Sequence, residues 1–260
     1  MPKRLRILLA NDDGIHAPGL RALHKELLTM GDVQVVAPLV EQSGVSHRIT
    51  YLHPILVKEI FEADGSHFGW AVDGSPADCV KLGVLEFCTE KPDLVVSGIN
   101  SGANVGINIL YSGTVAAAIE GAICGITSIA VSLQQGAMPP DYASTARGAV
   151  TLMRQILAAN ADKQTLWSIN FPETAETPPN GVRLSTMGYR RFADTVVKRT
   201  DPRGRPYYWS GIDPLKNHAM EPETDVKDLH ERYVTVTPLH FDLTETKLMR
   251  EFRGNSWSLE

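Results

Sequence analysis

The sequence has few cysteines, and no two of them lie close together. The three cysteines are Cys79, Cys88 and Cys124, an odd number without the short spacing of a zinc site or a redox motif. This spacing argues against a disulfide framework and against a cysteine-based metal site. Buried free thiols are the usual state of cysteine in a reducing compartment, so we expect a cytoplasmic protein.

Long hydrophobic runs are absent as well. No stretch approaches the ~20 apolar residues of a membrane-spanning helix, so we expect no membrane partner. Residues 1–10 place basic residues before an apolar run, but that run is too short for a secretion signal and ends at Asn11-Asp12-Asp13. We therefore interpret it as a first strand. The 260-residue chain is 43% hydrophobic and 21% charged, which is ordinary for a globular protein with a sizeable core.

Basic residues are not in excess. The chain has 25 lysines and arginines against 30 aspartates and glutamates, which gives a formal net charge of -5. This balance provides no overall attraction to nucleic acid or to an anionic membrane. We expect no stable nucleic-acid complex, and local groups must hold any anionic substrate.

Short apolar runs alternate with helical patterns up to residue 171. Each apolar run is long enough for a strand and too short for a helix. The predicted strands span residues 6–10, 33–37, 94–97, 128–133 and 166–170. The predicted helices span residues 17–30, 79–87, 113–124 and 142–160. This alternation predicts an α/β fold with a doubly wound, mostly parallel sheet that helices cover on both faces.

Two regions depart from this alternation. Residues 55–60 and 68–72 predict an antiparallel hairpin. After residue 171, prolines, glycines and charges predict loops between short strands and a final helix. The loops span 174–180 and 201–206, the strands span 182–186, 207–211 and 233–238, and the helix lies near 245–252. We interpret residues 1–172 as the core and 173–260 as a smaller, extended carboxyl-terminal region of the kind that pairs with a second subunit.

Polar side chains follow three of the predicted strands. They are Asp12 and Asp13 after the first strand, Ser43 after the second, and Asn100 after the third. Ligands of open parallel sheets bind at the carboxyl ends of the strands, so we expect these oxygen-bearing side chains to converge. Two adjacent carboxylates repel each other, and a divalent cation such as magnesium, manganese or calcium makes the arrangement favourable. The alternative is ordinary turn chemistry, with Asp13-Gly14 as a turn dipeptide.

Small residues are frequent in the stretch 97–121, which allows the backbone to approach a ligand closely. Within it, Ser112-Gly113-Thr114 opens a predicted helix, whose free amides and positive dipole end favour phosphate. The alternative is that Ser112 only caps the helix. Neither a P-loop nor the dinucleotide-binding glycine pattern occurs, which argues against a nicotinamide enzyme.

Five short motifs follow one another along the chain. They are Asn-Asp-Asp-Gly-Ile at 11–15 with Ala-Pro-Gly at 17–19, Gln-Ser-Gly at 42–44, Gly-Ser-Pro-Ala-Asp-Cys at 74–79, Ser-Gly-Ile-Asn-Ser-Gly-Ala-Asn at 97–104 and Tyr-Ser-Gly-Thr at 111–114. In this combination they resemble the motifs of the SurE survival-protein nucleotidases, with looser echoes at 224–225 and 236–239. One departure is Ser75, where the family more usually has threonine, and both residues provide a hydroxyl cap.

This resemblance implies a divalent-metal phosphatase that acts on nucleoside 5′- and 3′-monophosphates. It implies one divalent metal ion per subunit, magnesium or manganese, held by Asp12, Asp13, Ser43 and Asn100. It further implies a Rossmann-like core and a homodimer or homotetramer built by exchanged carboxyl-terminal segments. The expected partner is therefore a small-molecule nucleotide substrate.

The expected reaction is metal-assisted hydrolysis, with Asp12 and Asp13 as the catalytic carboxylates and water as the nucleophile. The residues expected to hold the phosphate oxygens are Asn104, Ser112, Gly113 and Thr114. One alternative is a phosphatase with an aspartyl-phosphate intermediate, although the two aspartates of such enzymes are usually separated by one residue. A second alternative is a non-catalytic nucleotide or metal sensor.

Other candidate side chains have simpler interpretations. His16 and His47 lie near the expected site, but isolated loop histidines are usually solvated or structural. The aromatic run 207–209 fits packing or an interface better than base stacking. The basic pairs 190–191 and 198–199 fit exposed charges.

Overall fold

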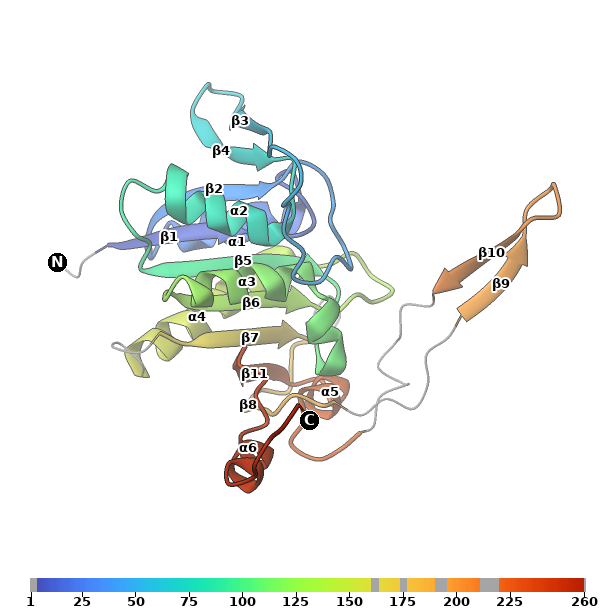
Figure 1. Ribbon diagram of the computed structural model, residues 1–260. Coiled ribbons are helices and arrows are strands. Elements are labelled where there is room, and N and C mark those ends of the chain that lie inside the picture. The colour runs from blue at the N-terminus through green and yellow to red at the C-terminus, as the bar shows by residue number, and fades with distance from the viewer. Residues whose placement is uncertain (1–3, 160–163, 174–176, 190–195, 211–219, 260) are drawn as a thin grey trace.

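A nine-stranded sheet forms the centre of the computed structural model, which describes residues 4–159, 164–173, 177–189, 196–210 and 220–259 (Figure 1). Across the sheet, the strands follow the order β3 (Val57–Phe61), β4 (His67–Val72), β2 (Gly31–Pro38), β1 (Leu5–Ala10), β5 (Leu94–Ser101), β6 (Thr127–Leu133), β7 (Leu166–Phe171), β11 (Val234–Leu239) and β8 (Val182–Leu184). From β4 to β7 all neighbouring strands are parallel. β3 is antiparallel to β4, and β11 is antiparallel to β7. The predicted α/β class with a mostly parallel sheet is confirmed.

Two pairs of helices cover the two faces of the sheet. They are α1 (Pro18–Leu27) with α4 (Tyr142–Ala159), and α2 (Pro76–Leu82) with α3 (Gly113–Ile123). Successive side chains of β1 point to opposite faces. Ile7 and Leu9 therefore pack in one buried cluster with α1 and α4, whereas Leu8 and Ala10 pack in another with α2 and α3. Because β1 is buried on both faces from Ile7 to Ala10, these four residues form a continuous apolar run that predicts the strand well.

Most predicted elements up to residue 171 are present, with shifted boundaries. The predicted 55–60 and 68–72 hairpin is β3–β4, and it also extends the main sheet through β2. The helix predicted over 79–87 is interrupted, because α2 ends at Leu82 and a π-helical turn, Gly83–Phe87, follows. A Cβ atom at Gly83 would lie 2.7 Å from the Leu8 side chain, so glycine lets this segment pack directly on β1. Residue 160, the predicted end of the fourth helix, lies outside the described residues.

The carboxyl-terminal region both extends the sheet and projects from it. β11 and β8 join the sheet beyond β7, and α5 (Asp225–His230) and α6 (Thr246–Phe252) lie at the same end of the molecule. β9 (Val196–Thr200) and β10 (Pro206–Ser210) form a separate antiparallel hairpin that extends away from the sheet (Figure 1). This confirms the extended carboxyl-terminal hairpin and helix region.

The sequence pattern predicts the strands β8, β10 and β11 and the helix α6, but three short elements are missing from the prediction. The missed elements are β9, α5 and a 3₁₀ helix, Gly106–Tyr111. Residues 174–176, 190–191 and 211, which belong to predicted features, lie outside the described residues. Among the helices of the described ranges, none has both the length and the hydrophobicity that crossing a bilayer requires.

Candidate active site

The candidate site lies at the carboxyl ends of β1 and β5, where the strand order reverses. From β1 the chain continues to β2 on one side, and β5 pairs with β1 on the other side. Such a switch point leaves a crevice beyond the strand ends, where ligands bind in open α/β sheets. The two aspartates follow β1 after Asn11, and Asn100 is the next-to-last residue of β5. The predicted location of the site therefore corresponds to the topology of the sheet.

The loop after β1 is fixed by its own side chains. The side-chain nitrogen of Asn11 donates to the backbone carbonyl of Gly14 at 2.9 Å, and the side-chain oxygen of Asn11 accepts from the backbone amide of Gly14 at 3.2 Å. Gly14 has a φ of 97°, a conformation that favours glycine. The amide of buried Ile15 then donates to the Pro38 carbonyl at 2.9 Å. These bonds hold the intervening Asp12 and Asp13 in one defined turn.

Asp12 is a buried carboxylate at the amino end of α3. Its side chain is 3% exposed, and Oδ1 accepts a hydrogen bond from the Thr114 hydroxyl at 2.5 Å. Burial raises the pKa of Asp12 to about 6; the bond from Thr114 opposes this shift, and the charge of Asp13 adds to it. The structure thus brings together a predicted metal ligand and a predicted phosphate-binding residue.

Gly113 completes this contact between the β1 loop and α3. A Cβ atom at Gly113 would lie 2.8 Å from Cβ of Asp12, 3.0 Å from its Oδ2, and 3.0 Å from Cγ of Pro76. Any larger residue would push Asp12 or α2 away. The glycine in Ser112-Gly113-Thr114 is therefore required by packing at this position.

Asp13 links the β1 loop to the end of β5. Its Oδ2 accepts a hydrogen bond from the Ser101 amide at 3.0 Å, beside Asn100. Burial raises the pKa of Asp13, the Ser101 amide opposes the shift, and Glu41 raises it further. The Asn100 side-chain nitrogen donates to the Gly102 carbonyl at 2.8 Å, so the carbonyl oxygen of this amide is the atom left to act as a ligand.

Ser43 is brought near this turn by backbone contacts, and its hydroxyl bonds elsewhere. The Gln42 amide donates to the Asp12 carbonyl at 2.8 Å, which anchors the loop after β2 to the loop after β1. The exposed Ser43 hydroxyl donates to Glu41 at 2.7 Å. Glu41 is a site residue that sequence reasoning missed, although a third carboxylate directly before Gln42-Ser43-Gly44 was a signal for it.

The other predicted phosphate-binding residues are held by neighbouring elements. Ser112 accepts from the Val115 amide at 3.1 Å and so caps α3, as the alternative interpretation predicts; a capping hydroxyl still has a proton to donate. Asn104 is buried, and its side-chain nitrogen donates to the Ser132 hydroxyl at 2.9 Å. The Thr114 hydroxyl donates its proton to the Asp12 carboxylate.

The two histidines near the site differ in their surroundings. His16 is exposed, whereas His47 lies 2.9 Å from a carboxylate oxygen of Glu120 on α3. The neighbouring Ser46 bonds to the carbonyls of Leu110 and Tyr111. These contacts fasten the loop after β2 to the last turns of α3 and to the 3₁₀ helix before it, in agreement with the structural interpretation of His47.

The donor set fits a hard divalent cation. Within the described ranges, no lysine or arginine pairs with Asp12 or Asp13, so these residues leave the two close carboxylates without a positive partner. Carboxylate and amide oxygens are the ligands that magnesium and manganese prefer. Within the described part of the chain, no group of three or more histidine, cysteine, aspartate or glutamate side chains forms a metal cluster. The candidate site instead combines two carboxylates, those of Asp12 and Asp13, with neutral side-chain oxygens.

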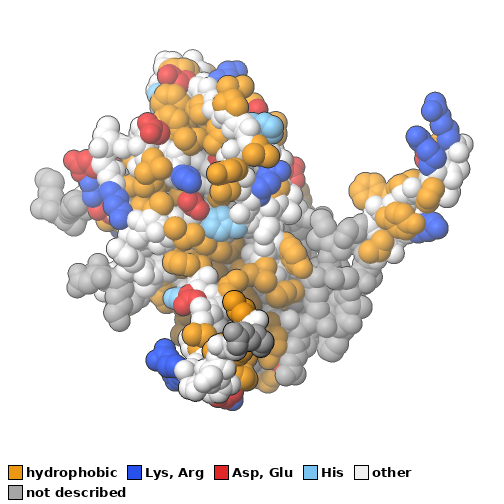
Figure 2. Space-filling model, viewed as in Figure 1, with side chains coloured by type: hydrophobic (Ala, Val, Ile, Leu, Met, Phe, Trp, Pro, Cys, Tyr) orange, Lys and Arg blue, Asp and Glu red, His pale blue; other side chains and the backbone are white. Residues whose placement is uncertain are grey.

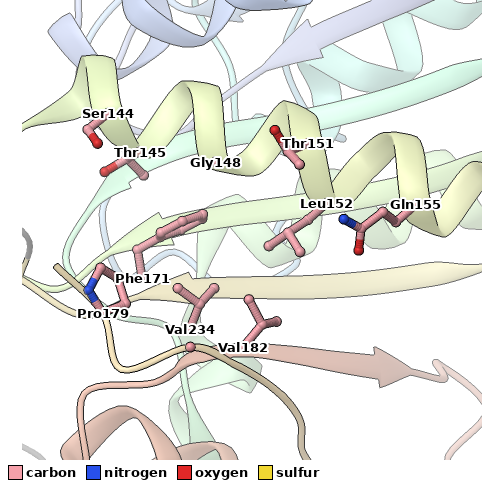
Figure 3. A pocket seen from close by; sticks show the side chains of 11 residues that line it. Ser144, Thr145, Gly148, Thr151, Leu152, Gln155, Phe171, Pro179, Val182 and Val234 are labelled. Atoms are coloured by element: carbon pink, nitrogen blue, oxygen red, sulfur yellow. The ribbon is translucent and has the colours of Figure 1, made fainter.

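An apolar hollow elsewhere on the molecule does not suit this chemistry. Its volume is about 370 Å³, and it lies between α4 and the strands β7, β8 and β11, where Phe171, Val182 and Val234 face the helix (Figure 3). Among the described residues that line it, none is charged. Its described lining provides hydroxyls and one side-chain amide but no carboxylate for a cation, so we do not assign the reaction to it.

Comparisons with known proteins identify relatives over most of the chain. A family model described as "Survival protein SurE" matches residues 7–194. A protein named 5′-nucleotidase SurE from Rhodopirellula baltica is 49% identical over 98% of this chain and 99% of its own length. A protein of the same name from Pelotomaculum thermopropionicum is 44% identical over 96% of this chain and 94% of its own. The crystal structure of a SurE protein from Aquifex aeolicus, 39% identical, superimposes with a TM-score of 0.81 and covers 95% of this chain and 98% of that chain.

Proposed function

Because this chain belongs to the survival protein SurE family, we propose that it is a divalent-metal-dependent phosphomonoesterase. Its substrates are nucleoside 5′- and 3′-monophosphates, which it hydrolyses to a nucleoside and phosphate. Support for the nucleotide substrate comes from the relatives that carry the name 5′-nucleotidase SurE over nearly their whole length. Support for the chemistry comes from the site at the ends of β1 and β5.

The observation that carries this proposal is the buried carboxylate of Asp12 at the amino end of α3. Asp12 thereby places a carboxylate that can bind a cation next to a helix end that can bind a phosphate. The residues that would hold one magnesium or manganese ion per subunit are Asp12, Asp13, Ser43 and Asn100. When bound, such a cation supplies Lewis-acid stabilisation of the charge on a phosphoryl oxygen.

We assign the remaining tasks to side chains and amides of the chain itself. Asp13, the more exposed of the two aspartates, accepts the proton of the attacking water, a role that its raised pKa favours. The groups that hold the non-bridging phosphate oxygens are Asn104, Ser112 and Gly113. Thr114 instead fixes Asp12, because its hydroxyl proton is donated to that carboxylate at 2.5 Å.

Release of inorganic phosphate from a panel of nucleoside 5′- and 3′-monophosphates, measured with magnesium and with manganese, tests the proposal. We expect turnover that a chelator abolishes. Asp12→Asn should lower kcat/KM by more than about a hundredfold, because residues that merely orient metal ligands already contribute ~10–100-fold. Retention of full activity by this variant contradicts the assignment. Binding without turnover indicates a sensor instead, and a trapped phosphorylated aspartate indicates the aspartyl-phosphate route.

We extend the proposal to the assembly and its location. Residues 1–172 form the catalytic core, and residues 173–260 join subunits into a homodimer or homotetramer. The exposed apolar side chains of the β9–β10 hairpin support this role. The three free cysteines suit a reducing cytoplasm.

A further inference from the structure

The short segment Asn104–Gly106 connects a proposed phosphate ligand to the 3₁₀ helix that leads to Ser112. Its first residue is held by the side chain of Asn170, which is fully buried at the end of β7. The side-chain oxygen of Asn170 accepts from the backbone amide of Asn104 at 2.8 Å, and the side-chain nitrogen of Asn170 donates to the backbone carbonyl of Asn104 at 3.1 Å. One side chain thus reproduces the pair of hydrogen bonds that a neighbouring strand would provide.

The last residue of the segment is held by Asp225, the first residue of α5. Oδ2 of Asp225 accepts from the Gly106 amide at 2.9 Å. Oδ1 accepts from the Gly188 amide at 2.9 Å and from the Val226 amide at 2.8 Å. Asp225 is 0% exposed, so three amides from three separate parts of the chain converge on one buried carboxylate.

The middle residue of the segment is packed against the same helix. Val105 is buried in a small apolar cluster with Val226 and Leu229 of α5. The hydrogen bond from the Gly106 amide to Asp225 and the apolar contact of Val105 therefore both involve α5, an element of the carboxyl-terminal region. Together they leave the segment little freedom to shift.

We propose that Asp225 is a positioning residue for phosphate binding, which holds the segment Asn104–Gly106 in the conformation that the reaction needs. Asn170 acts on the same segment from β7. The carboxyl-terminal region thereby completes a site whose other residues come from the core. This inference rests on the proposed function, because Asn104 and Ser112 are proposed ligands.

The chemistry of Asp225 explains why a carboxylate stands at this position. A carboxylate only accepts hydrogen bonds, and all three bonds to Asp225 come from amide donors. Burial raises its pKa to about 6, and the three amides oppose that rise. In Asp225→Asn, one side-chain atom becomes an NH₂ group that faces an amide donor, so at least one buried donor is left without an acceptor.

Asp228 offers a matched control on the same helix. It is 3% exposed, and its carboxylate accepts from Arg183 at 2.7 Å and from the Ser185 hydroxyl at 2.6 Å. These partners belong to β8 and the residue after it, not to the segment Asn104–Gly106. Asp228→Asn therefore disturbs a buried carboxylate of α5 without touching the proposed phosphate ligands.

The test compares full-length Asp225→Asn, Asp228→Asn and the parent protein. It measures KM and kcat for a nucleoside monophosphate, the inhibition constant of inorganic phosphate, and the dissociation constant of manganese. In Asp225→Asn we expect KM and the phosphate constant to rise together by about tenfold, because the segment Asn104–Gly106 shifts away from its binding position, with less than a twofold change for manganese. Asp228→Asn should leave KM, kcat, the phosphate constant and the manganese constant unchanged, even if its melting temperature falls as far as that of Asp225→Asn.

Equal phosphate constants in the two variants overturn the inference, and so does a parallel loss of manganese binding in Asp225→Asn. If Asp225→Asn does not fold, Asn170→Ser tests the same segment from β7. It should raise KM and the phosphate constant, and unchanged values again overturn the inference. A parent protein that neither hydrolyses nucleotides nor binds phosphate contradicts the proposed function itself, which separates the two failures.

Discussion

At the scale of single residues, the cost of burying Asp12 is the most informative property of the site. Its pKa of about 6 lies above the ordinary value of 3.8, so the folded protein binds this proton more tightly than the unfolded chain. The free energy of unfolding of the metal-free protein therefore falls as the pH rises from about 4 to about 6. At neutral pH the ionised Asp12 costs up to about 3 kcal/mol, since each pKa unit corresponds to ~1.4 kcal/mol.

Asp12→Asn should relieve this cost. We expect the metal-free variant to unfold at a higher temperature at pH 7, with a gain of about 1–3 kcal/mol, although it loses activity. Thermal unfolding at pH 7 and pH 4 measures the effect, and the gain should shrink at pH 4, where the parent Asp12 is protonated. Asp13→Asn is the comparison and should gain less, because Asp13 is more exposed. A destabilised Asp12→Asn protein at pH 7 contradicts this account.

The same pKa predicts how metal binding depends on pH. A carboxylate must be deprotonated to bind a cation, so below pH 6 a proton competes for Asp12. We expect the association constant for manganese to fall about tenfold for each pH unit below 6, and faster if Asp13 also takes up a proton. Calorimetric titrations between pH 5 and pH 8 measure this dependence. An affinity that is flat from pH 5 to pH 7 excludes Asp12 as a ligand.

The residues of the site could be predicted from sequence only where their immediate neighbours in the sequence form a recognisable pattern. Asp12 and Asp13 are adjacent acids after an apolar strand, and Gly113 lies in a recognisable helix start. Asn170 has no such local signal, because it only ends a predicted strand, and Asp225 has only the looser motif echo at 224–225 at the start of a six-residue helix. Their contacts with Asn104 and Gly106 bridge 66 and 119 residues of sequence, so only the folded chain reveals them.

At the scale of elements, the fit of α3 against the β1 loop depends on the absence of a side chain at Gly113. Gly113→Ala introduces a methyl group 2.8 Å from Cβ of Asp12. We expect Asp12 to shift and kcat/KM to fall by about 10–100-fold, as a displaced catalytic group of this kind does. Phosphate release assays measure the loss, and circular dichroism should show that the fold persists. Gly254→Ala is the control, because no atom lies within 4 Å of its added Cβ, and an equal loss there contradicts the argument.

The strands of the sheet were predictable and several short elements were not, for a common reason. Strands buried on both faces contain unbroken apolar runs, such as Ile7–Ala10 of β1, whose pattern needs no knowledge of the fold. β9 has the sequence Val-Val-Lys-Arg-Thr, all of it exposed, so no buried face shapes its pattern. α5 is held by the capping side chain of Thr224 and by packing of Val226 and Leu229, which sequence periodicity over six residues does not show.

At the scale of the whole molecule, the sheet accounts for the core but not for the β9–β10 hairpin. The hairpin extends away from the body, and hydrophobic side chains cover much of it (Figures 1 and 2). Val196, Val197, Tyr207, Tyr208 and Trp209 are all exposed. An isolated two-stranded hairpin is at best marginally stable in water. This hairpin therefore needs a further surface, which a second copy of the chain supplies in the proposed assembly.

The double substitution Tyr208→Ser and Trp209→Ser tests that assembly without shortening the chain. These two side chains are 60% and 61% exposed, and burying aromatic groups of this size dominates the energy of many interfaces. We expect the parent protein to have the mass of a dimer or tetramer by light scattering, and the variant to shift to a smaller species at the same concentration. Leu85→Ser is the control, because Leu85 is 64% exposed on the turn after α2, far along the chain from the hairpin, and should leave the mass unchanged. A parent protein that is already monomeric, or a variant with the parent mass, shows that the hairpin does not hold the subunits together.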